Sequence, residues 1–272
     1  MIKIINDEKV VIPFINTLKD NKYFLSPMYT NEEEINHNLI KRIKHPDDLV
    51  IAVYDDETII GVFSIFIEKE EKYMEVLLCF SSLKKAYDEV FEYLKVNYPG
   101  YQCDIVANPN NYILIDKLKE LNAKFDTQQN YMKLDRFNEY KHNLKIVKYE
   151  EKYKEQYIKI HTVDRYWIAE KVINALDKFN VFLALNDEEV IGYIDVSSSF
   201  EINEPYDLFV LEKYRNKGYG KALLSEAIKA NFPKQMDLTV DIDNESGKHL
   251  YEELGFVRNS IKDSVCIHFY LN

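Results

Sequence analysis

The chain repeats one strand–turn–strand pattern in each of its halves, and this repeat restricts its possible folds more than any other feature. Residues Val50–Gly61 align without a gap with residues Val181–Gly192. Each stretch contains an apolar strand, a turn with two or three acidic residues and a second apolar strand, which is typical of a β-hairpin. Two copies of such a unit in one chain indicate a duplication. A chance similarity between two hairpins is the alternative.

Two further matches follow in the same order. Asn97-Tyr98-Pro99 aligns with Asn231-Phe232-Pro233, and each triplet ends an amphipathic, helix-like pattern. Asn111 then falls at nearly the same offset as Asn244. Three matches in one order favour a tandem duplication over chance.

The duplication predicts two domains of similar construction, each with strands and helices. We expect the domains at residues 1–140 and 141–272, with the boundary in the polar stretch 137–143. A chain of 272 residues is long enough for two domains that each bury a core.

Composition and charge exclude several other classes of protein. Charged residues make up 30% of the chain, and no apolar run is long enough to span a membrane. The N-terminus lacks the apolar segment of a secretory signal. A net charge of -11 argues against nucleic-acid binding, which requires a basic face. We therefore expect a cytoplasmic protein that binds neither nucleic acid nor membranes.

The cysteines and histidines give no sign of a disulfide or metal site. Cys79, Cys103 and Cys266 are odd in number and lie in or beside apolar, strand-like runs, so we interpret them as reduced core residues. The six histidines lack the spacing of metal ligands, and we predict no metal site.

A strand, a basic turn and a helix follow one another in residues 206–224. The turn contains Gly218 and Gly220, which allow the main chain to approach a bulky ligand closely. Arg215, Lys217 and Lys221 add positive charge beside the N-terminus of the helix. Such a turn is suited to a pyrophosphate group.

The spacing R-N-K-G-Y-G of this turn resembles the R/Q-x-x-G-x-G/A turn of the GNAT superfamily of acyl-CoA-dependent N-acetyltransferases. It matches neither a dinucleotide-binding fingerprint nor a P-loop. Leu238–Ile242, Asn244, Leu250-Tyr251 and Leu254–Phe256 resemble the next strand, helix and ending of that family. The resemblance covers roughly residues 144–272. Together with the duplication it implies an α/β fold of two tandem GNAT-like domains, each a mixed, mostly antiparallel sheet flanked by helices. Two glycines in an ordinary strand-to-helix turn are the alternative interpretation.

The resemblance implies a site for acetyl-CoA between two splayed parallel strands, Leu208–Leu211 and Leu238–Ile242. It implies that the N–H of Val210 polarises the thioester carbonyl, that Asn244 binds the pantetheine arm and that Tyr251 gives a proton to the sulfur of coenzyme A. The cofactor-binding residues would be Phe209, Val210, Arg215, Asn216, Lys217, Gly218, Tyr219, Gly220, Lys221 and Asn244.

The base that takes the proton of the amine is open between two residues. Glu204 and Asp207 precede the cofactor strand in an arrangement that resembles many family members, although a solvated loop carboxylate explains either one as well. Asp195 could face the acceptor pocket, but we expect it to be exposed. Tyr166 and Trp167 could line that pocket or serve in core packing.

The first half lacks the residues that this chemistry needs. Aligning the ends of the two helices places Lys84 at the position of Gly218 and Ala86 at that of Gly220, so that side chains obstruct the turn. Leu118 takes the place of Tyr251. We interpret residues 1–140 as a degenerate copy without a cofactor turn.

The sequence therefore predicts an acetyl-CoA-dependent N-acetyltransferase that acts on a primary amine of a small molecule or peptide. The amine would attack directly in a ternary complex in the C-terminal domain. Two alternatives are an acyl-CoA-binding tandem module with a sensing or regulatory role, and a transferase with another acyl donor.

Overall fold

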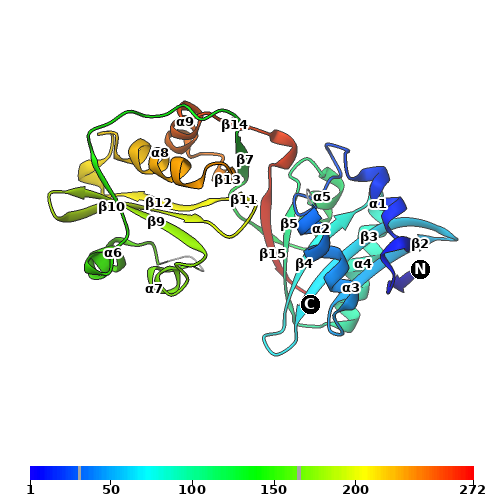
Figure 1. Cartoon of the computed structure of the whole chain (residues 1–272). Helices are drawn as coiled ribbons and strands as arrows, with labels where there is room; N and C mark the ends of the chain where they lie inside the picture. The colour runs from blue at the N-terminus through cyan, green and yellow to red at the C-terminus, as the bar shows by residue number, and fades with distance from the viewer. Residues whose placement is uncertain (30–31, 164–166) are drawn as a thin grey trace. The chain divides into compact units, whose positions relative to one another are not determined.

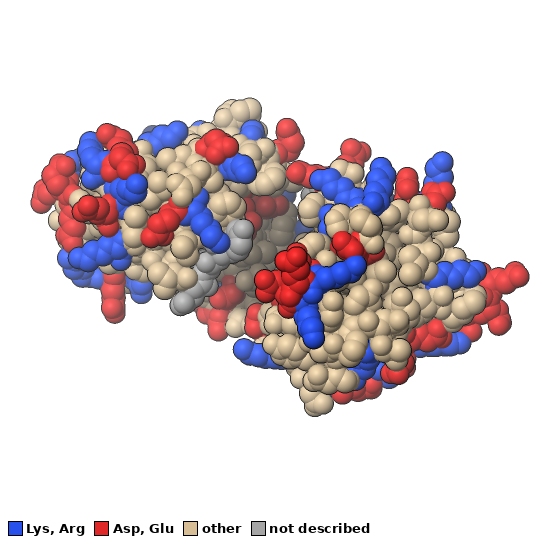
Figure 2. Space-filling model, turned by 90° about the horizontal axis from the view of Figure 1, so that it is seen from below, with Lys and Arg blue, Asp and Glu red and all other residues tan. Residues whose placement is uncertain are grey.

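The computed structural model describes residues 1–29, 32–163 and 167–272. The chain forms two compact units, one made of Met1–Asn130 with Ser260–Asn272 and the other of Tyr131–Asn259. Each unit combines β-sheet with helices, so the α/β class predicted from the sequence is confirmed (Figure 1). Figure 2 shows acidic and basic side chains interspersed on the visible faces of both units. No helix in the described ranges is long and apolar enough to cross a membrane.

The first unit contains a seven-stranded sheet in the order β1-β2-β3-β4-β5-β15-β6. Its neighbouring strands pair antiparallel except for the parallel pair β4–β5. The strands are β1 (Ile2–Ile4), β2 (Leu49–Asp55), β3 (Thr58–Glu68), β4 (Tyr73–Phe80), β5 (Gln102–Ala107), β6 (Lys124–Phe125) and β15 (Val265–Tyr270). The helices are α1 (Ile12–Leu18), α2 (Glu32–Ile35), α3 (Lys41–Lys44), α4 (Lys84–Asn97) and α5 (Tyr112–Glu120).

Both faces of this sheet are covered by apolar side chains. Alternate residues of β2 and β3 pack on opposite sides, so Ile51 and Phe63 join α4 and α5, whereas Val50 and Val62 join α1. This alternation follows from the two-residue period of a strand. It explains why β2 reads as a continuous apolar run.

The second unit contains two four-stranded sheets, in the orders β12-β10-β9-β8 and β11-β13-β7-β14. Its strands are β7 (Gln129–Leu134), β8 (Lys145–Lys148), β9 (Phe179–Asn186), β10 (Glu189–Ser197), β11 (Ile202–Asn203), β12 (Pro205–Val210), β13 (Gln235–Asp241) and β14 (Phe256–Arg258). Its helices are α6 (Lys154–Ile160), α7 (Ala169–Ile173), α8 (Tyr219–Asn231) and α9 (Glu245–Glu253). Helices α8 and α9 lie on one side of the sheet strands, and α6 and α7 lie on the other (Figure 1).

Each unit includes a strand from the other half of the sequence. Strand β15, at the end of the chain, lies between β5 and β6 of the first unit, where Ile267, Phe269 and Leu271 are buried. His268 of this strand is within 3.0 Å of Asp104 and 2.8 Å of Asp126. Strand β7 precedes the predicted boundary in the sequence but lies between β13 and β14 of the second unit. The compact units therefore divide the chain differently from the predicted ranges 1–140 and 141–272, which remain a prediction about the duplicated sequence.

The matched positions of the two halves have the same local structure. Asp56 and Asp187 both have a φ of 52° in their hairpin turns. Asn111 and Asn244 both precede a helix and accept a hydrogen bond from the main-chain N–H three residues later. A capping asparagine stabilises the first turn of a helix because it satisfies a free N–H group.

Candidate active site

The glycine-containing turn leaves the N-terminus of α8 open to a ligand. Gly218 precedes this 13-residue helix with a φ of 86°, and no side chain caps the first turn. A Cβ on Gly218 would lie 2.6 Å from the hydroxyl oxygen of Tyr140, so a larger residue would displace this hydroxyl. The first N–H groups of a helix that has no side-chain cap are available to an anion.

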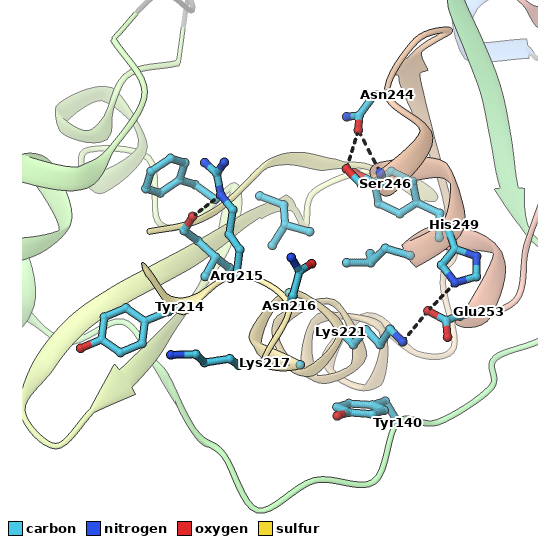
Figure 3. A pocket seen from close by; sticks show the side chains of 18 residues that line it. Tyr140, Tyr214, Arg215, Asn216, Lys217, Lys221, Asn244, Ser246, His249 and Glu253 are labelled. Carbon is cyan, nitrogen blue, oxygen red and sulfur yellow. Dashed lines mark hydrogen bonds and ion pairs between the residues drawn. The ribbon is translucent and has the colours of Figure 1, made fainter. Parts of the chain in front are cut away.

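Three basic side chains surround this turn (Figure 3). Arg215 donates its Nε–H to the carbonyl oxygen of Val210 at 3.0 Å. Lys217 donates to the carbonyl oxygen of Lys213 at 2.9 Å. Lys221 lies 2.5 Å from a carboxylate oxygen of Glu253. Arg215 and Lys217 are thus held by neutral carbonyl groups, and these contacts do not neutralise their positive charge.

Strands β12 and β13 separate beside this turn. Strand β11, which comes just before β12, pairs in parallel with Gln235–Met236 of β13, whereas β12 is the edge strand of the other sheet. Leu211 N–H donates to the carbonyl of Ile191 on the β10 side. Because the hydrogen bonds of an antiparallel pair alternate, the main-chain groups of Leu208 and Val210 point away from β10, toward the gap.

A cleft of about 870 Å³ joins the turn, the gap and helix α9. Nine of the ten predicted cofactor-binding residues line it: Phe209, Val210, Arg215, Asn216, Lys217, Gly218, Gly220, Lys221 and Asn244. The tenth, Tyr219, packs edge-on against Tyr214 with ring centroids 6.1 Å apart. The lining also includes Tyr251, predicted to be the acid.

Asn244 and Tyr251 lie at opposite ends of one face of α9. The side-chain oxygen of Asn244 accepts a hydrogen bond from Gly247 N–H at 2.9 Å, so this oxygen caps the helix. The ring of Tyr251 packs at an angle against Phe256, 5.8 Å between centroids. Because seven residues are two helical turns, both side chains reach the same cleft.

Neither predicted base lies in the wall of this cleft. Asp207 is 7% exposed and accepts a hydrogen bond from the hydroxyl of Tyr193 at 2.6 Å. The main-chain N–H of Glu204 donates a hydrogen bond to the side-chain hydroxyl of Ser197, and its carbonyl oxygen accepts one from the main-chain N–H of Ser197. Phe209 connects the two regions, since it lines the cleft and stacks on Tyr193 at 5.9 Å.

Asp195 is wholly buried, which corrects the expectation that it is exposed. Its two carboxylate oxygens accept a hydrogen bond from Tyr157 at 2.8 Å and pair with Nε2 of His161 at 2.8 Å. The other ring nitrogen of His161 lies 2.8 Å from the carbonyl oxygen of Thr162. The alternation of side chains along β10 indicated on which face of the strand Asp195 lies, but it did not indicate that α6 covers this face. Trp167 packs on Phe179, and Tyr166 lies outside the described residues.

The pKa values of His161 and Asp195 are both raised, which favours the protonated form of each group. Burial lowers the pKa of His161, but hydrogen bonds to Asp195 and to the Thr162 carbonyl outweigh it and leave the pKa above its usual value. Burial also raises the pKa of Asp195, against the hydrogen bonds from His161 and Tyr157. Both shifts keep a proton between the two groups.

The corresponding turn of the first half has another geometry. Leu83, which precedes α4, has an ordinary extended φ of -125°. Lys84 pairs with Asp88 and Glu120, and Lys85 pairs with Asp55. Ala86 and Leu118 are fully buried. No residue of this turn has a positive φ, and Lys84 and Lys85 are paired with carboxylates.

Comparisons with known proteins identify the fold of this site. Residues 177–258 match the model of the acetyltransferase (GNAT) domain. The chain carries a GNAT domain. The GNAT match contains β12, the turn, α8 and α9, which form the cleft.

Two curated relatives match part of the chain. One, named uncharacterized N-acetyltransferase YycN of Bacillus subtilis, is 29% identical over 86 residues, which are 29% of this chain and 55% of that protein. The other, named N-alpha-acetyltransferase 30 of Xenopus laevis, is 38% identical over 99 residues, 34% of this chain and 35% of that protein. The chain thus spans about half or less of the length of each.

Solved structures match over the whole chain. A GCN5-related N-acetyltransferase from Sphaerobacter thermophilus has a TM-score of 0.68 at 10% identity, and covers 100% of this chain and 96% of its own. A tandem GNAT protein from the clavulanic acid biosynthesis pathway has a TM-score of 0.57 at 10% identity, with 100% and 99% covered. The predicted fold, two tandem GNAT-like domains, is confirmed.

Several residues of the cleft escaped the sequence interpretation. They are Tyr140, Tyr214, Ser246, Gly247, His249, Leu250 and Glu253, whereas Leu208 belongs to a strand that was expected to border the site. Gly247 lies three residues after Asn244 and four before Tyr251, so helical spacing was a signal for it. His249 and Glu253 each lie two residues from Tyr251, a spacing that does not place them on its face, so helical spacing gave no signal for them. Tyr140 lies in the polar stretch interpreted as a boundary, and nothing in its sequence context indicates a role.

Proposed function

We propose that the chain transfers an acetyl group from acetyl-CoA to a primary amine of a small molecule or peptide, with the GNAT domain as the catalytic part. The observation that carries this proposal is the uncapped N-terminus of α8 behind the left-handed Gly218. A pyrophosphate is the group that such a basic, glycine-containing turn binds best. The GNAT match over the same residues supports the choice of coenzyme A.

The residues of the cleft suit coenzyme A along its length. The N–H groups at the start of α8, with Arg215 and Lys217, would hold the pyrophosphate. The main-chain groups of Leu208, which point into the gap, would pair with the amides of the pantetheine arm, as an added strand does. Asn244 would contribute its side-chain amide N–H groups to the same arm, since its oxygen caps α9.

Acetyl-CoA supplies an activated acyl group as a thioester. The N–H of Val210 would polarise the carbonyl oxygen and stabilise the negative charge that develops on it. A neutral amine would attack the carbonyl carbon, and the carbon–sulfur bond would break. Tyr251 would give its proton to the leaving thiolate. Asp207 or Glu204 would accept the amine proton through water, because neither residue lines the cleft.

Thermal unfolding and thiol release together test this function. Acetyl-CoA should raise the melting temperature once its concentration exceeds its dissociation constant. A library of amines should contain an acceptor that releases free thiol, and Tyr251→Phe should lower that rate without weakening acetyl-CoA binding. No thermal shift at saturating acetyl-CoA would contradict the proposal.

The same measurements distinguish the alternatives. Larger thermal shifts with succinyl-CoA than with acetyl-CoA would indicate another acyl donor. Binding of acetyl-CoA without thiol release for any amine in the library would favour a sensing or regulatory module. Thiol release by Tyr251→Phe at the wild-type rate would show that Tyr251 is not the acid.

A further inference from the structure

The side chain of Tyr140 reaches the anion-binding turn from the segment that joins the two halves of the sequence. Its hydroxyl oxygen lies 2.6 Å from the position that a Cβ of Gly218 would take. The Nζ atom of Lys221 lies 6.0 Å from the centre of its ring. Figure 3 shows Tyr140 and Lys221 at the same side of the cleft. A phenol and an ammonium group thus lie beside the uncapped end of α8.

The main chain on the N-terminal side of Tyr140 is fixed against α9. Asn138 donates its main-chain N–H to the carbonyl oxygen of Leu254 at 3.0 Å. The carbonyl of Arg136 lies where a Cβ of Gly255 would be, so only glycine permits this close approach. Gly255 has a φ of 99°, which also favours glycine.

Contacts with α8 fix Tyr140 itself. Its N–H donates to the hydroxyl of Ser225, a buried residue of α8, at 3.2 Å. Its ring stacks on His142 with 5.8 Å between centroids and 24° between planes. One residue earlier, Glu139 forms an ion pair of 2.7 Å with Lys229. The segment therefore holds the ring in place before a ligand arrives.

The hydroxyl of Tyr140 is the part of this side chain that has no partner. Its N–H and ring make the contacts above, and its hydroxyl makes no hydrogen bond within residues 1–29, 32–163 and 167–272. A phenol hydroxyl can donate one hydrogen bond, and a phosphate oxygen is a strong acceptor for it.

We propose that Tyr140 is a cofactor-binding residue whose hydroxyl donates a hydrogen bond to the pyrophosphate of coenzyme A. The proposal rests on the function proposed above for the identity of the ligand. The segment between the two halves then serves as one wall of the nucleotide site, and the GNAT match at residues 177–258 does not include this wall.

Calorimetry with the full chain and Tyr140→Phe tests this assignment. Coenzyme A and dephospho-coenzyme A are the two probes, because they share the pyrophosphate and differ in the 3′-phosphate. Tyr140→Phe should weaken both by the same factor, about ten- to a hundredfold, because a hydrogen bond to a charged group is lost. Tyr149→Phe, which removes a hydroxyl that donates to Glu151, is the matched control and should change neither affinity.

The outcomes separate this proposal from the function on which it rests. An unchanged or tighter affinity of Tyr140→Phe, or a loss with coenzyme A alone, would overturn the assignment of Tyr140. No binding of coenzyme A by the wild type would instead contradict the proposed function. An unchanged melting temperature of the ligand-free variant would show that the fold is intact.

Discussion

Nε2 of His161 lies 2.8 Å from Oδ2 of Asp195, and both side chains are almost wholly enclosed in the second unit. The opposite ring nitrogen faces the carbonyl oxygen of Thr162, which can only accept a hydrogen bond. The ring therefore donates from Nδ1 and shares a second proton with Asp195. Such a pair is costly to break because one partner alone leaves an uncompensated buried charge.

Asp195→Ala should lower the free energy of unfolding by about 3–5 kcal/mol, the usual effect of breaking a buried pair. Urea unfolding of the full chain measures this change. Asp177→Ala, at an exposed position of the same unit, is the control and should change it by less than about 0.5 kcal/mol. Equal effects of the two substitutions would show that the pair does not stabilise the fold.

The pair should also make stability depend on pH. Because the pKa of His161 is raised in the folded chain, its contribution is complete below the unfolded value of 6.5 and disappears as pH rises through the folded pKa. Asp195, whose pKa is also raised, acts in the same direction, and Tyr157, Tyr193 and Asp207 are the other ionisable groups of the cluster.

The pH effect can be isolated with His161→Gln. His268 in the first unit also has a raised pKa, because hydrogen bonds to Asp126 and Asp104 outweigh its burial, and it contributes with the same sign. The difference in unfolding free energy between wild type and His161→Gln should therefore shrink as pH rises above 6.5. A difference that is constant with pH would contradict a raised pKa of His161.

Gly218→Ala should separate backbone strain from ligand binding when it is compared with Gly100→Ala. Both glycines have a positive φ, 86° and 79°, so each substitution should cost about 1–2 kcal/mol of stability. Only a Cβ at position 218 meets a neighbour, the Tyr140 hydroxyl, whereas nothing lies within 4 Å at position 100. Calorimetry should find weaker binding of coenzyme A by Gly218→Ala alone, and equal affinities would refute the role of the turn.

Glu253 places a negative charge in the cleft and neutralises Lys221. Glu253→Gln should therefore tighten the binding of coenzyme A about three- to tenfold at low ionic strength, and the gain should shrink with added salt. Glu252→Gln removes the same charge from an exposed residue of the same helix that does not line the cleft, and it serves as the control. A gain of the same size in Glu252→Gln would indicate a general charge effect instead.

The place of β15 in the first unit can be tested through its buried face. Ile267→Ala should destabilise that unit by about 2–5 kcal/mol, because the side chain is fully buried there. Amide hydrogen exchange of β5 should accelerate, since β5 pairs with β15. Val257→Ala on β14, where the side chain is 55% exposed, should leave exchange in β5 unchanged.

The local features of this fold were predictable from the sequence, because short patterns determine them. The acidic turns at Asp56 and Asp187 and the capping Asn111 and Asn244 depend only on residues a few positions away. The turn at Gly218 also depends on spacing alone, and its match with a known family added the expected ligand.

Features that depend on distant residues were not predictable in this way. Nothing in the pattern of Val265–Tyr270 indicates that this strand pairs with β5 of the first half. The burial of Asp195 depends on Tyr157 of α6 and on His161 just after this helix, 38 and 34 residues away. The place of Tyr140 over Gly218 depends on how the joining segment crosses α8 and α9. Long-range packing decided each case.

Calorimetric titration of the full chain with coenzyme A decides whether the start of α8 is a ligand site. We expect one site with a dissociation constant in the micromolar range for the wild type, and much weaker binding for Gly218→Ala. No heat of binding for the wild type, or equal binding by the variant, would contradict a ligand site at the start of α8.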